Sequence, residues 1–308
     1  MCMRNWFKIL AGNSNPVLAR RICGILGVAP GQAMVGAFRN GEIRVELYEN
    51  VRGGDIFVVQ SACRPVNRNI MELLVMLDAL KRASAGRISA IVPYYGYGRQ
   101  DQKDRPRVSI TAKVLADLLS VAGADRIISV DLHATQMEGF FTIPVDNLVS
   151  TRVLMDDLAH CLTGDDVVVA PDAGGVRRAR AFAERLGIEL AIMDHRGVDH
   201  RPTLVGRVKG RRVIVLDDMV DTGRTLMRTV EAAQSAGAAA VDAYCIHGVL
   251  SPGALEAVEA SPLRSLVITD TIPPPPAGGK LRVLSMAPML AEAVKQVHFE
   301  KSISAILT

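Results

Sequence analysis

Two segments far apart in this chain share one design, in which an apolar strand runs directly into an acidic turn. They are Arg126-Ile-Ile-Ser-Val-Asp131 and Arg212-Val-Ile-Val-Leu-Asp217, and segments with helical spacing precede and follow each of them. Strands that alternate with helices form largely parallel sheets covered by helices on both faces. The sequence therefore predicts an α/β protein with two similar halves, residues 1–145 and 146–308, in which the end of the chain can pack on either half.

Local signals in the first half refine this expectation. Asn40-Gly41 just before the strand-like Ile43–Leu47 is a hairpin signal, so we expect an N-terminal antiparallel ribbon. Further on, Asn69 followed three residues later by Glu72 predicts the start of a helix, which Gly86 ends.

Composition excludes several classes of protein. The chain has 308 residues, 49% of them hydrophobic, and a formal net charge of +4, which is globular and too weakly basic to imply a nucleic-acid partner. No apolar run reaches the ~18–20 residues that a membrane helix needs. Five cysteines without CxxC pairing argue for reduced thiols and against a disulfide frame or a zinc site. We therefore expect a cytoplasmic protein with neither a nucleic-acid nor a membrane partner.

The strongest chemical signal is the stretch 213–225, where a buried strand is followed by acids, a small polar loop and a helix opening near Thr225. Backbone N–H groups, hydroxyls and a helix N-terminus suit a phosphate, while two acids at a strand end can accept hydrogen bonds from ribose hydroxyls. The alternative is a helix cap with solvated acids, which explains only one acid and one threonine. The residues predicted to hold a sugar phosphate are Asp217, Asp218, Asp221, Thr222, Gly223, Arg224 and Thr225.

This stretch resembles the ribose-5-phosphate loop of the phosphoribosyltransferase fold. Other segments make nearly the whole chain similar to the ribose-phosphate pyrophosphokinase (phosphoribosyl pyrophosphate synthetase) family. The matching segments are Asn40–Glu42, Glu49–Asp55, Asp78–Ser84, Pro93–Asp101, Asp131–Ala134, Pro171–Gly175 and Ser302–Ala305. The resemblance implies two phosphoribosyltransferase-type domains, an N-terminal one that binds ATP and a C-terminal one that binds ribose 5-phosphate.

The resemblance also implies roles for residues of the first half. Arg99, Gln100 and Asp101 match the family's ATP-binding segment, with Lys103 as a further phosphate contact; the alternative is a solvated charged loop. Phe38, Asn40 and Glu42 match a segment that reaches the adenine pocket of a neighbouring subunit, although a plain hairpin turn has the same pattern. The family usually has Asp where this chain has Asn40.

His133 and Asp172 each follow an apolar strand, one in each half, and match family positions at the catalytic Mg²⁺. Asp172 is the natural oxygen ligand for this ion. His133 is the less usual ligand and could contact the ion through water; the alternative is an ordinary histidine at a strand end.

The reaction implied is transfer of the β,γ-diphosphoryl group of ATP to the 1-hydroxyl of ribose 5-phosphate, giving 5-phosphoribosyl 1-diphosphate and AMP. The family supplies positive charge from a flexible loop that begins Asp-Lys-Arg-Arg, whereas this chain has Asp194-His195-Arg196-Gly197. Arg196 and His195 are therefore the candidate catalytic residues. Losing one cation at such a site costs on the order of 10²–10³ in rate, so a weakened or inactive regulatory paralogue is the alternative.

A nucleobase phosphoribosyltransferase is the third interpretation, but it leaves Arg99–Asp101 and His133 unexplained. The resemblance finally implies a homo-oligomer, a hexamer built from dimers. It also implies activation by phosphate and inhibition by ADP in a region that includes Arg52, Ser302 and Ser304.

Overall fold

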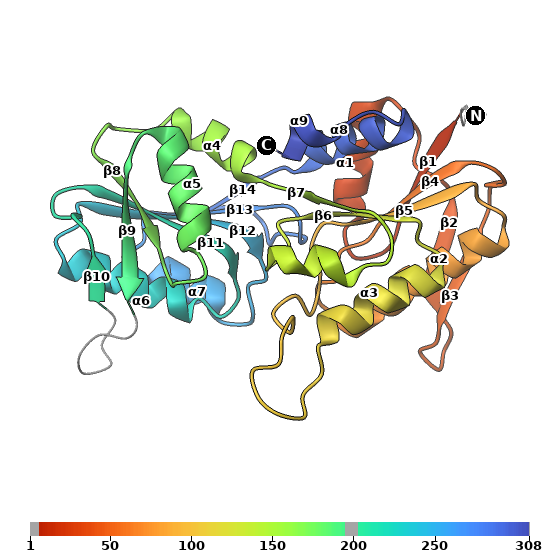
Figure 1. Cartoon of the computed structure of the whole chain (residues 1–308), viewed down its shortest axis with the longest axis horizontal. Helices are drawn as coiled ribbons and strands as arrows, with labels where there is room; N and C mark the ends of the chain where they lie inside the picture. Colours follow the sequence, from red (N-terminus) through yellow and green to blue (C-terminus); the bar gives the residue numbers. More distant parts are fainter. Residues whose placement is uncertain (1–5, 195–202, 308) are drawn as a thin grey trace. The chain divides into compact units, whose positions relative to one another are not determined.

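The computed structural model describes residues 6–194 and 203–307, which fold into two compact α/β units (Figure 1). The first unit comprises Met1–Val149, Thr271–Pro273 and Ser285–Thr308, and the second comprises Ser150–Asp270 and Pro274–Leu284. The predicted fold class, two mainly parallel sheets flanked by helices with a small antiparallel ribbon, is confirmed.

The sheet of the first unit has the order β1-β4-β5-β6-β7, with every neighbouring pair parallel. Its strands are β1 Phe7–Ala11, β4 Asp55–Val59, β5 Arg87–Val92, β6 Arg126–Val130 and β7 Val145–Leu148. Every residue of β4 is buried, as expected of a parallel strand covered on both faces.

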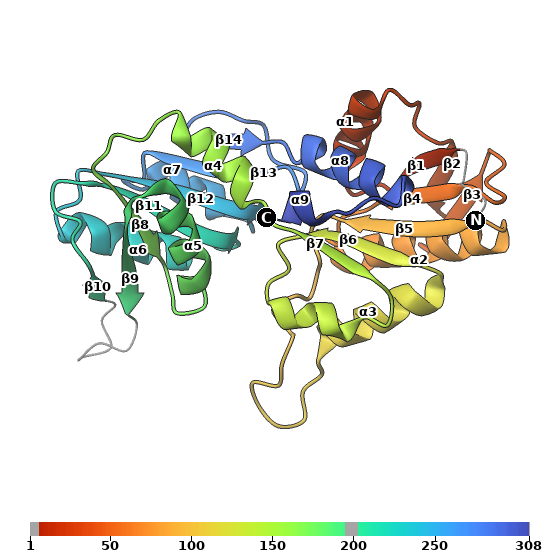
Figure 2. The same ribbon diagram turned by 45° about the horizontal axis from the view of Figure 1, so that its top comes forward.

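Helices cover both faces of this first sheet, α1 and α8 on one and α2 and α3 on the other (Figures 1 and 2). Their bounds are α1 Pro16–Leu26, α2 Val66–Arg82, α3 Thr111–Ala122 and α8 Ala287–His298, with a 3-10 helix at Thr135–Phe140 and a short α9 at Ser304–Leu307. The end of the chain, left open between the two halves, therefore belongs to the first unit.

The predicted hairpin is confirmed as the antiparallel pair of β2 Ala33–Ala37 and β3 Ile43–Leu47. At its tip the N–H of Phe38 donates to the carbonyl of Glu42 at 2.8 Å. Gly41 has φ +91°, a left-handed conformation that glycine adopts without steric cost.

The predicted start of α2 at Asn69 is wrong, because the helix begins at Val66 directly after Pro65. Proline suits the start of a helix, since the first N–H groups have no partner within the helix. Asn69 is buried inside the helix, where its side chain donates to the carbonyl of Cys63 at 2.9 Å. A residue type that often caps a helix therefore serves here to fix the chain that leads into it.

The sheet of the second unit has the order β10-β9-β8-β11-β12-β13-β14, parallel except for the β9–β10 pair. The strands are β8 Asp166–Ala170, β9 Glu189–Asp194, β10 Thr203–Val205, β11 Arg212–Val220, β12 Ala240–Gly248, β13 Ser265–Thr269 and β14 Leu281–Leu284. The helices are α4 Thr151–Ala159, α5 Val176–Leu186, α6 Arg224–Ser235 and α7 Ala254–Ala260. Figure 1 shows α4 and α5 on one face and α6 and α7 on the other.

The predicted strand ends at Asp217, but β11 is longer, because it continues through Asp218 to Val220. Asp217 pairs with Cys245 on β12, and the register continues to Val220 opposite Gly248. The chain passes from β8 outward to β9 but returns to place β11 on the other side of β8. Such a reversal of strand order opens a crevice at the carboxyl ends of the strands, where α/β proteins bind ligands.

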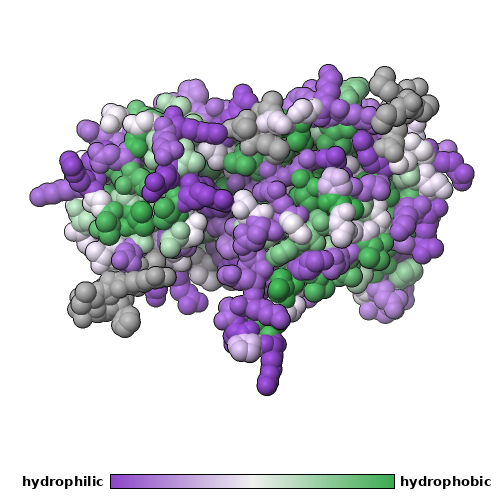
Figure 3. Space-filling model, in the orientation of Figure 1, coloured by the Kyte–Doolittle hydropathy of each residue, from purple (hydrophilic) through white to green (hydrophobic). Residues whose placement is uncertain are grey.

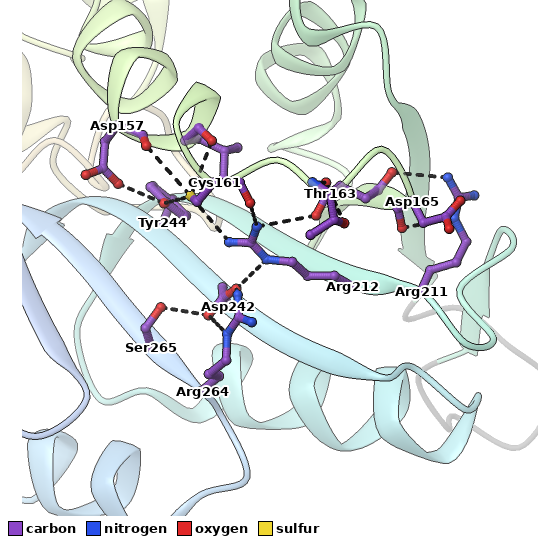
Figure 4. A network of polar contacts seen from close by, with 12 residues as sticks. Asp157, Cys161, Thr163, Asp165, Arg211, Arg212, Asp242, Tyr244, Arg264 and Ser265 are labelled. Atoms are coloured by element: carbon purple, nitrogen blue, oxygen red, sulfur yellow. Dashed lines mark hydrogen bonds and ion pairs between the residues drawn. The ribbon is translucent and has the colours of Figure 1, made fainter.

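The amino-terminal ends of the same strands carry a polar network instead (Figure 4). Arg212 donates to the carboxylate of Asp242 at 2.7 Å and faces Asp166 at 3.4 Å. Ser265 donates to the other oxygen of Asp242 at 2.7 Å. These contacts join the starts of β8, β11, β12 and β13, at the edge opposite their carboxyl ends.

No helix in the described part of the chain is both long and apolar enough to cross a membrane.

Candidate functional site

Three acids lie at the carboxyl ends of β8 and β11, where the strand order of the second unit reverses. Asp172 lies in the turn between β8 and α5, and its Oδ1 accepts the backbone N–H of Gly175 at 2.9 Å. Asp217 lies on β11, and its Oδ1 accepts the N–H of Asp218 at 2.8 Å. The topology thus brings the predicted metal ligand Asp172 to the same sheet edge as two of the predicted sugar ligands.

The electrostatics of this edge are unusual. Burial, the neighbouring charge of Asp218 and a hydrogen bond to its side chain raise the pKa of Asp217, and the charge of Asp172 adds to the effect. Burial, followed by Asp217 and Asp218, also raises the pKa of Cys245 on the adjacent β12. Carboxylates crowded in this way favour a site that binds hydroxyl donors or a cation.

The loop after β11 leads into α6 through Gly223, which has φ +75° and occupies the N-cap position. Glycine has no side chain with which to cap a helix, so none of the acids or threonines of this loop is the N-cap residue. The hydroxyl of Thr222 accepts the N–H of Arg224 at 3.5 Å. Thr222, Arg224 and Thr225 are exposed, which leaves the N-terminus of a 12-residue helix open to an anion.

In the first unit, Arg99, Gln100 and Asp101 lie near the middle of the long loop 93–110 between β5 and α3. The hydroxyl of Thr111 donates to the side-chain carbonyl of Gln100 at 2.6 Å. Asp101 is buried and accepts a hydrogen bond from the side chain of Gln136 at 3.0 Å. Hydrogen bonds from Thr111 and Gln136 therefore hold this part of the loop in place.

The same loop lies beside His133. Gly98 is so close to this residue that an alanine in its place would have its Cβ 3.4 Å from the Cβ of His133. His133 is exposed just after β6. Beyond Asp101 the loop is exposed from Gln102 to Arg107, a stretch that includes Lys103. Figure 3 shows this projecting tip as predominantly hydrophilic. The structure thus places the loop segment 98–101 beside His133, beyond the carboxyl ends of β5 and β6.

The tip of the β2–β3 ribbon presents Phe38, which is 50% exposed. The guanidinium of Arg44 lies 5.6 Å from the centroid of its ring. The side chain of Asn40 accepts the N–H of Glu42 at 3.2 Å. An aromatic ring that a cation holds on an exposed turn can stack on a planar ligand.

The donor chemistry near β8 suits Mg²⁺. Across residues 6–194 and 203–307, no group of three or more His, Cys, Asp or Glu side chains is arranged to hold a metal ion. Mg²⁺ rarely needs such a cage, because one or two carboxylates usually bind it together with water and substrate phosphates. Asp172, with Asp217 and Asp218 near it, fits this pattern. His133 belongs to the other unit.

Two predicted residues, His195 and Arg196, lie outside the described residues. Conversely, no local pattern in the sequence marks Gln136 or Ser251, although each contacts a predicted site residue. Gln136 holds Asp101, and Ser251 contacts Asp221 through both its hydroxyl and its backbone N–H. Both contacts join segments that are distant in the chain, so only the tertiary structure reveals them.

Comparison with known proteins agrees with this arrangement. Residues 7–123 match the N-terminal domain of ribose phosphate pyrophosphokinase, and residues 198–308 match the phosphoribosyl synthetase-associated domain. The ribose-phosphate pyrophosphokinase of Burkholderia pseudomallei is 48% identical over 314 residues, which cover 99% of each chain. That of Vibrio parahaemolyticus is 48% identical over 308 residues, which cover 97% of this chain and 98% of the relative.

A solved structure gives the same result for the fold. The crystal structure of phosphoribosylpyrophosphate synthetase from Mycobacterium smegmatis has a TM-score of 0.92 and 43% identity, covering 96% of this chain and 99% of that one. Two parallel sheets, acids where the strand order reverses and similarity over nearly the full length lead to one conclusion: this chain belongs to the ribose-phosphate pyrophosphokinase family.

Proposed function

We propose that the protein transfers the β,γ-diphosphoryl group of ATP to the 1-hydroxyl of ribose 5-phosphate. The products are 5-phosphoribosyl 1-diphosphate and AMP, and the first supplies nucleotide biosynthesis. The observation that carries the proposal is the convergence of Asp172, Asp217 and Asp218 at the reversal of strand order, directly before a loop that opens α6. In a member of this family, that arrangement suits a phosphorylated sugar.

The C-terminal half, residues 146–308, is proposed to bind the sugar. The N–H groups of the loop 221–225, the hydroxyls of Thr222 and Thr225 and the N-terminus of α6 would hold the 5-phosphate. Asp217 and Asp218 would accept hydrogen bonds from the ribose hydroxyls. Their crowding supports this role, because hydroxyl donors relieve the electrostatic cost of adjacent carboxylates.

The N-terminal half, residues 1–145, is proposed to bind ATP. Arg99 and Lys103 would contact phosphate oxygens, while Gln100 and Asp101 would contact the nucleotide. Asp172, with His133 acting directly or through water, would hold Mg²⁺, which neutralises phosphate charge when bound.

Phe38, Asn40 and Glu42 are proposed to contact the adenine bound by a neighbouring copy, in a homo-oligomer that we expect to be a hexamer. Phosphate as an activator and ADP as an inhibitor belong to the same proposal. So does a cytosolic location, which the unpaired state of the four described cysteines supports: Cys23, Cys63, Cys161 and Cys245.

The charge that stabilises the transferring group is proposed to come from Arg196 and His195. A specific observation favours a second possibility, a weakened or inactive paralogue: His195 and Gly197 stand where the family pattern has Lys and Arg. The side chains that would bind the sugar phosphate are independent of this difference, so both possibilities retain binding.

One experiment separates the possibilities. The purified protein is incubated with ATP, Mg²⁺ and ribose 5-phosphate, and AMP and 5-phosphoribosyl 1-diphosphate are quantified. Equimolar formation of both supports the transferase. Calorimetric binding of ribose 5-phosphate without turnover would support the inactive paralogue, and the absence of both binding and turnover would contradict the proposal.

A further inference from the structure

We propose that Ser251 is a positioning residue for ribose 5-phosphate, which fixes Asp221 and thereby preforms the loop 221–225 before the sugar binds. The inference rests on the proposed function of that loop. Ser251 lies between β12 and α7, thirty positions beyond Asp221 in the chain.

Two backbone hydrogen bonds join residues 250–251 to residues 220–221. The N–H of Leu250 donates to the carbonyl of Val220 at 3.0 Å, and the N–H of Ser251 donates to the carbonyl of Asp221 at 3.0 Å. The hydroxyl of Ser251 donates in addition to Oδ1 of Asp221. Both the backbone and the side chain of Asp221 are therefore held from one residue.

The conformation of the segment 250–251, which contacts Asp221, is itself fixed. Leu250 has φ +44°, a left-handed conformation that is unfavourable for leucine and persists only where surrounding structure imposes it. Its side chain packs against the apolar core of the second unit. The core therefore sets the position of Leu250, and Leu250 sets that of Ser251.

The negative charge of Asp221 explains why the loop needs the hydrogen bond from Ser251. Asp221 is the acid immediately before Thr222 and Gly223, in the segment proposed to hold a dianionic phosphate. Its carboxylate would repel that phosphate unless a hydrogen-bond donor holds and partly neutralises it. Ser251 supplies that donor. Without the hydroxyl, the carboxylate loses this donor, and more of the ordering of the loop must then occur when the sugar binds.

The test compares ribose 5-phosphate binding and steady-state kinetics in the wild type and Ser251→Ala. A hydrogen bond to a charged group predicts about a tenfold rise in Kd and KM for ribose 5-phosphate, with kcat and the KM for ATP within about twofold. Ser251→Thr keeps the hydroxyl and should restore wild-type affinity, whereas the similarly shaped Ser251→Val should not. This second pair decides the question if Ser251→Ala does not fold.

The matched control is Ser265→Ala, which removes another serine-to-aspartate hydrogen bond in the same unit, at the opposite edge of the sheet. It should leave the affinity for ribose 5-phosphate unchanged. A double-mutant cycle with Asp221→Asn adds a readout that a general loss of stability would not give. Ser251→Ala should lose most of its effect in that background, because the charge it restrains is gone; full additivity would overturn the inference.

Thr222→Ala and Asp217→Asn separate the inference from the function on which it rests. If both weaken ribose 5-phosphate binding while Ser251→Ala binds like the wild type, the positioning role of Ser251 is wrong and the sugar site stands. If neither weakens binding, the loop is not the sugar site and the inference fails with it.

Discussion

Nε of Arg212 donates to Oδ2 of Asp242 at 2.7 Å, joining β11 to β12 at the edge of the second sheet opposite the candidate site. Both side chains are buried, at 8% and 1% exposure. Arg264 adds a second cation to the same carboxylate (Figure 4). This pair anchors the strand that carries Asp217 at its other end.

We expect Asp242→Asn to lower the free energy of unfolding by about 3 kcal/mol at pH 7, because it leaves a buried guanidinium without its main counter-charge. Ser265→Ala, which removes one neutral donor to the same carboxylate, should cost about 1 kcal/mol. Urea denaturation of the three proteins measures both values. Equal costs for the two variants would contradict the assignment of Asp242 as the centre of the network.

The same residue predicts a pH dependence. Although burial raises the pKa of Asp242, hydrogen bonds from Arg264, Ser265 and Arg212 outweigh it, so the pKa is lowered overall. A lowered carboxyl pKa contributes stability that is complete above its ordinary value near 4 and is lost as pH falls through the folded value. The difference in stability between wild type and Asp242→Asn should therefore shrink in acid. A difference that stays constant from pH 7 to pH 3 would refute this.

Asp217 should behave in the opposite way in the ligand-free protein. Its pKa is raised, first by burial and then by Asp218, so the folded state binds more protons than the unfolded state above about pH 4. Stability should fall as pH rises through the folded pKa. Asp217→Asn removes this loss and should be more stable than the wild type at pH 8 by about 1 kcal/mol, but not at pH 4. Urea titrations at both values test it, and parallel pH profiles would contradict it.

In the first unit, Asp55 is fully buried and joins the sheet to the end of helix α8. Nε of Arg87 donates to its carboxylate at 2.8 Å, and Nδ1 of His298 lies 2.8 Å from it. We expect Arg87→Met to cost about 3 kcal/mol, because it leaves a buried carboxylate without its arginine. The control is Arg82→Met, whose partner Asp78 lies on the exposed face of α2 and whose cost should be far smaller, because solvent screens an exposed ion pair. Similar unfolding free energies for the two variants would rule out this role for Asp55.

The substituted loop gives a prediction for catalysis. Changing His195 to Lys and Gly197 to Arg should raise kcat by about 10² if the missing cations limit the rate. The Kd for ribose 5-phosphate should not change, because the proposed sugar ligands lie elsewhere in the chain. Steady-state assays with matched calorimetry test this. An unchanged or lower kcat would mean that the chain compensates for both differences.

Repeated local patterns made the architecture predictable from sequence. A few neighbouring residues are enough to identify a buried apolar strand such as β4 or a helix with one apolar face. A turn such as Asn40-Gly41 is identified by its two residues alone. The start of α2 was not predictable, because Pro65 and Asn69 both carry start signals and only the packing around Cys63 decides between them. The short β1, β10 and β14 are strands because they pair with neighbouring strands, and local sequence does not show that pairing.

The site shows the same division. The acids and threonines of 217–225 fall within nine neighbouring positions, so their chemistry is visible in the sequence. The extension of β11 beyond Asp217 to Val220 is not visible, because it depends on β12 continuing to Gly248. Gln136 and Ser251 come from segments that the fold alone brings to Asp101 and Asp221, and a single serine or glutamine carries no pattern of its own.

The most direct test of the account follows the phosphorus atoms themselves. The protein is incubated with ribose 5-phosphate, Mg²⁺ and ATP labelled at the γ-phosphorus, and the labelled products are separated. The proposed reaction predicts that the label appears in the terminal phosphate of 5-phosphoribosyl 1-diphosphate, with one AMP formed for each labelled molecule. Label in a ribose bisphosphate with ADP as the second product would contradict it, because only a single phosphoryl group would then have moved.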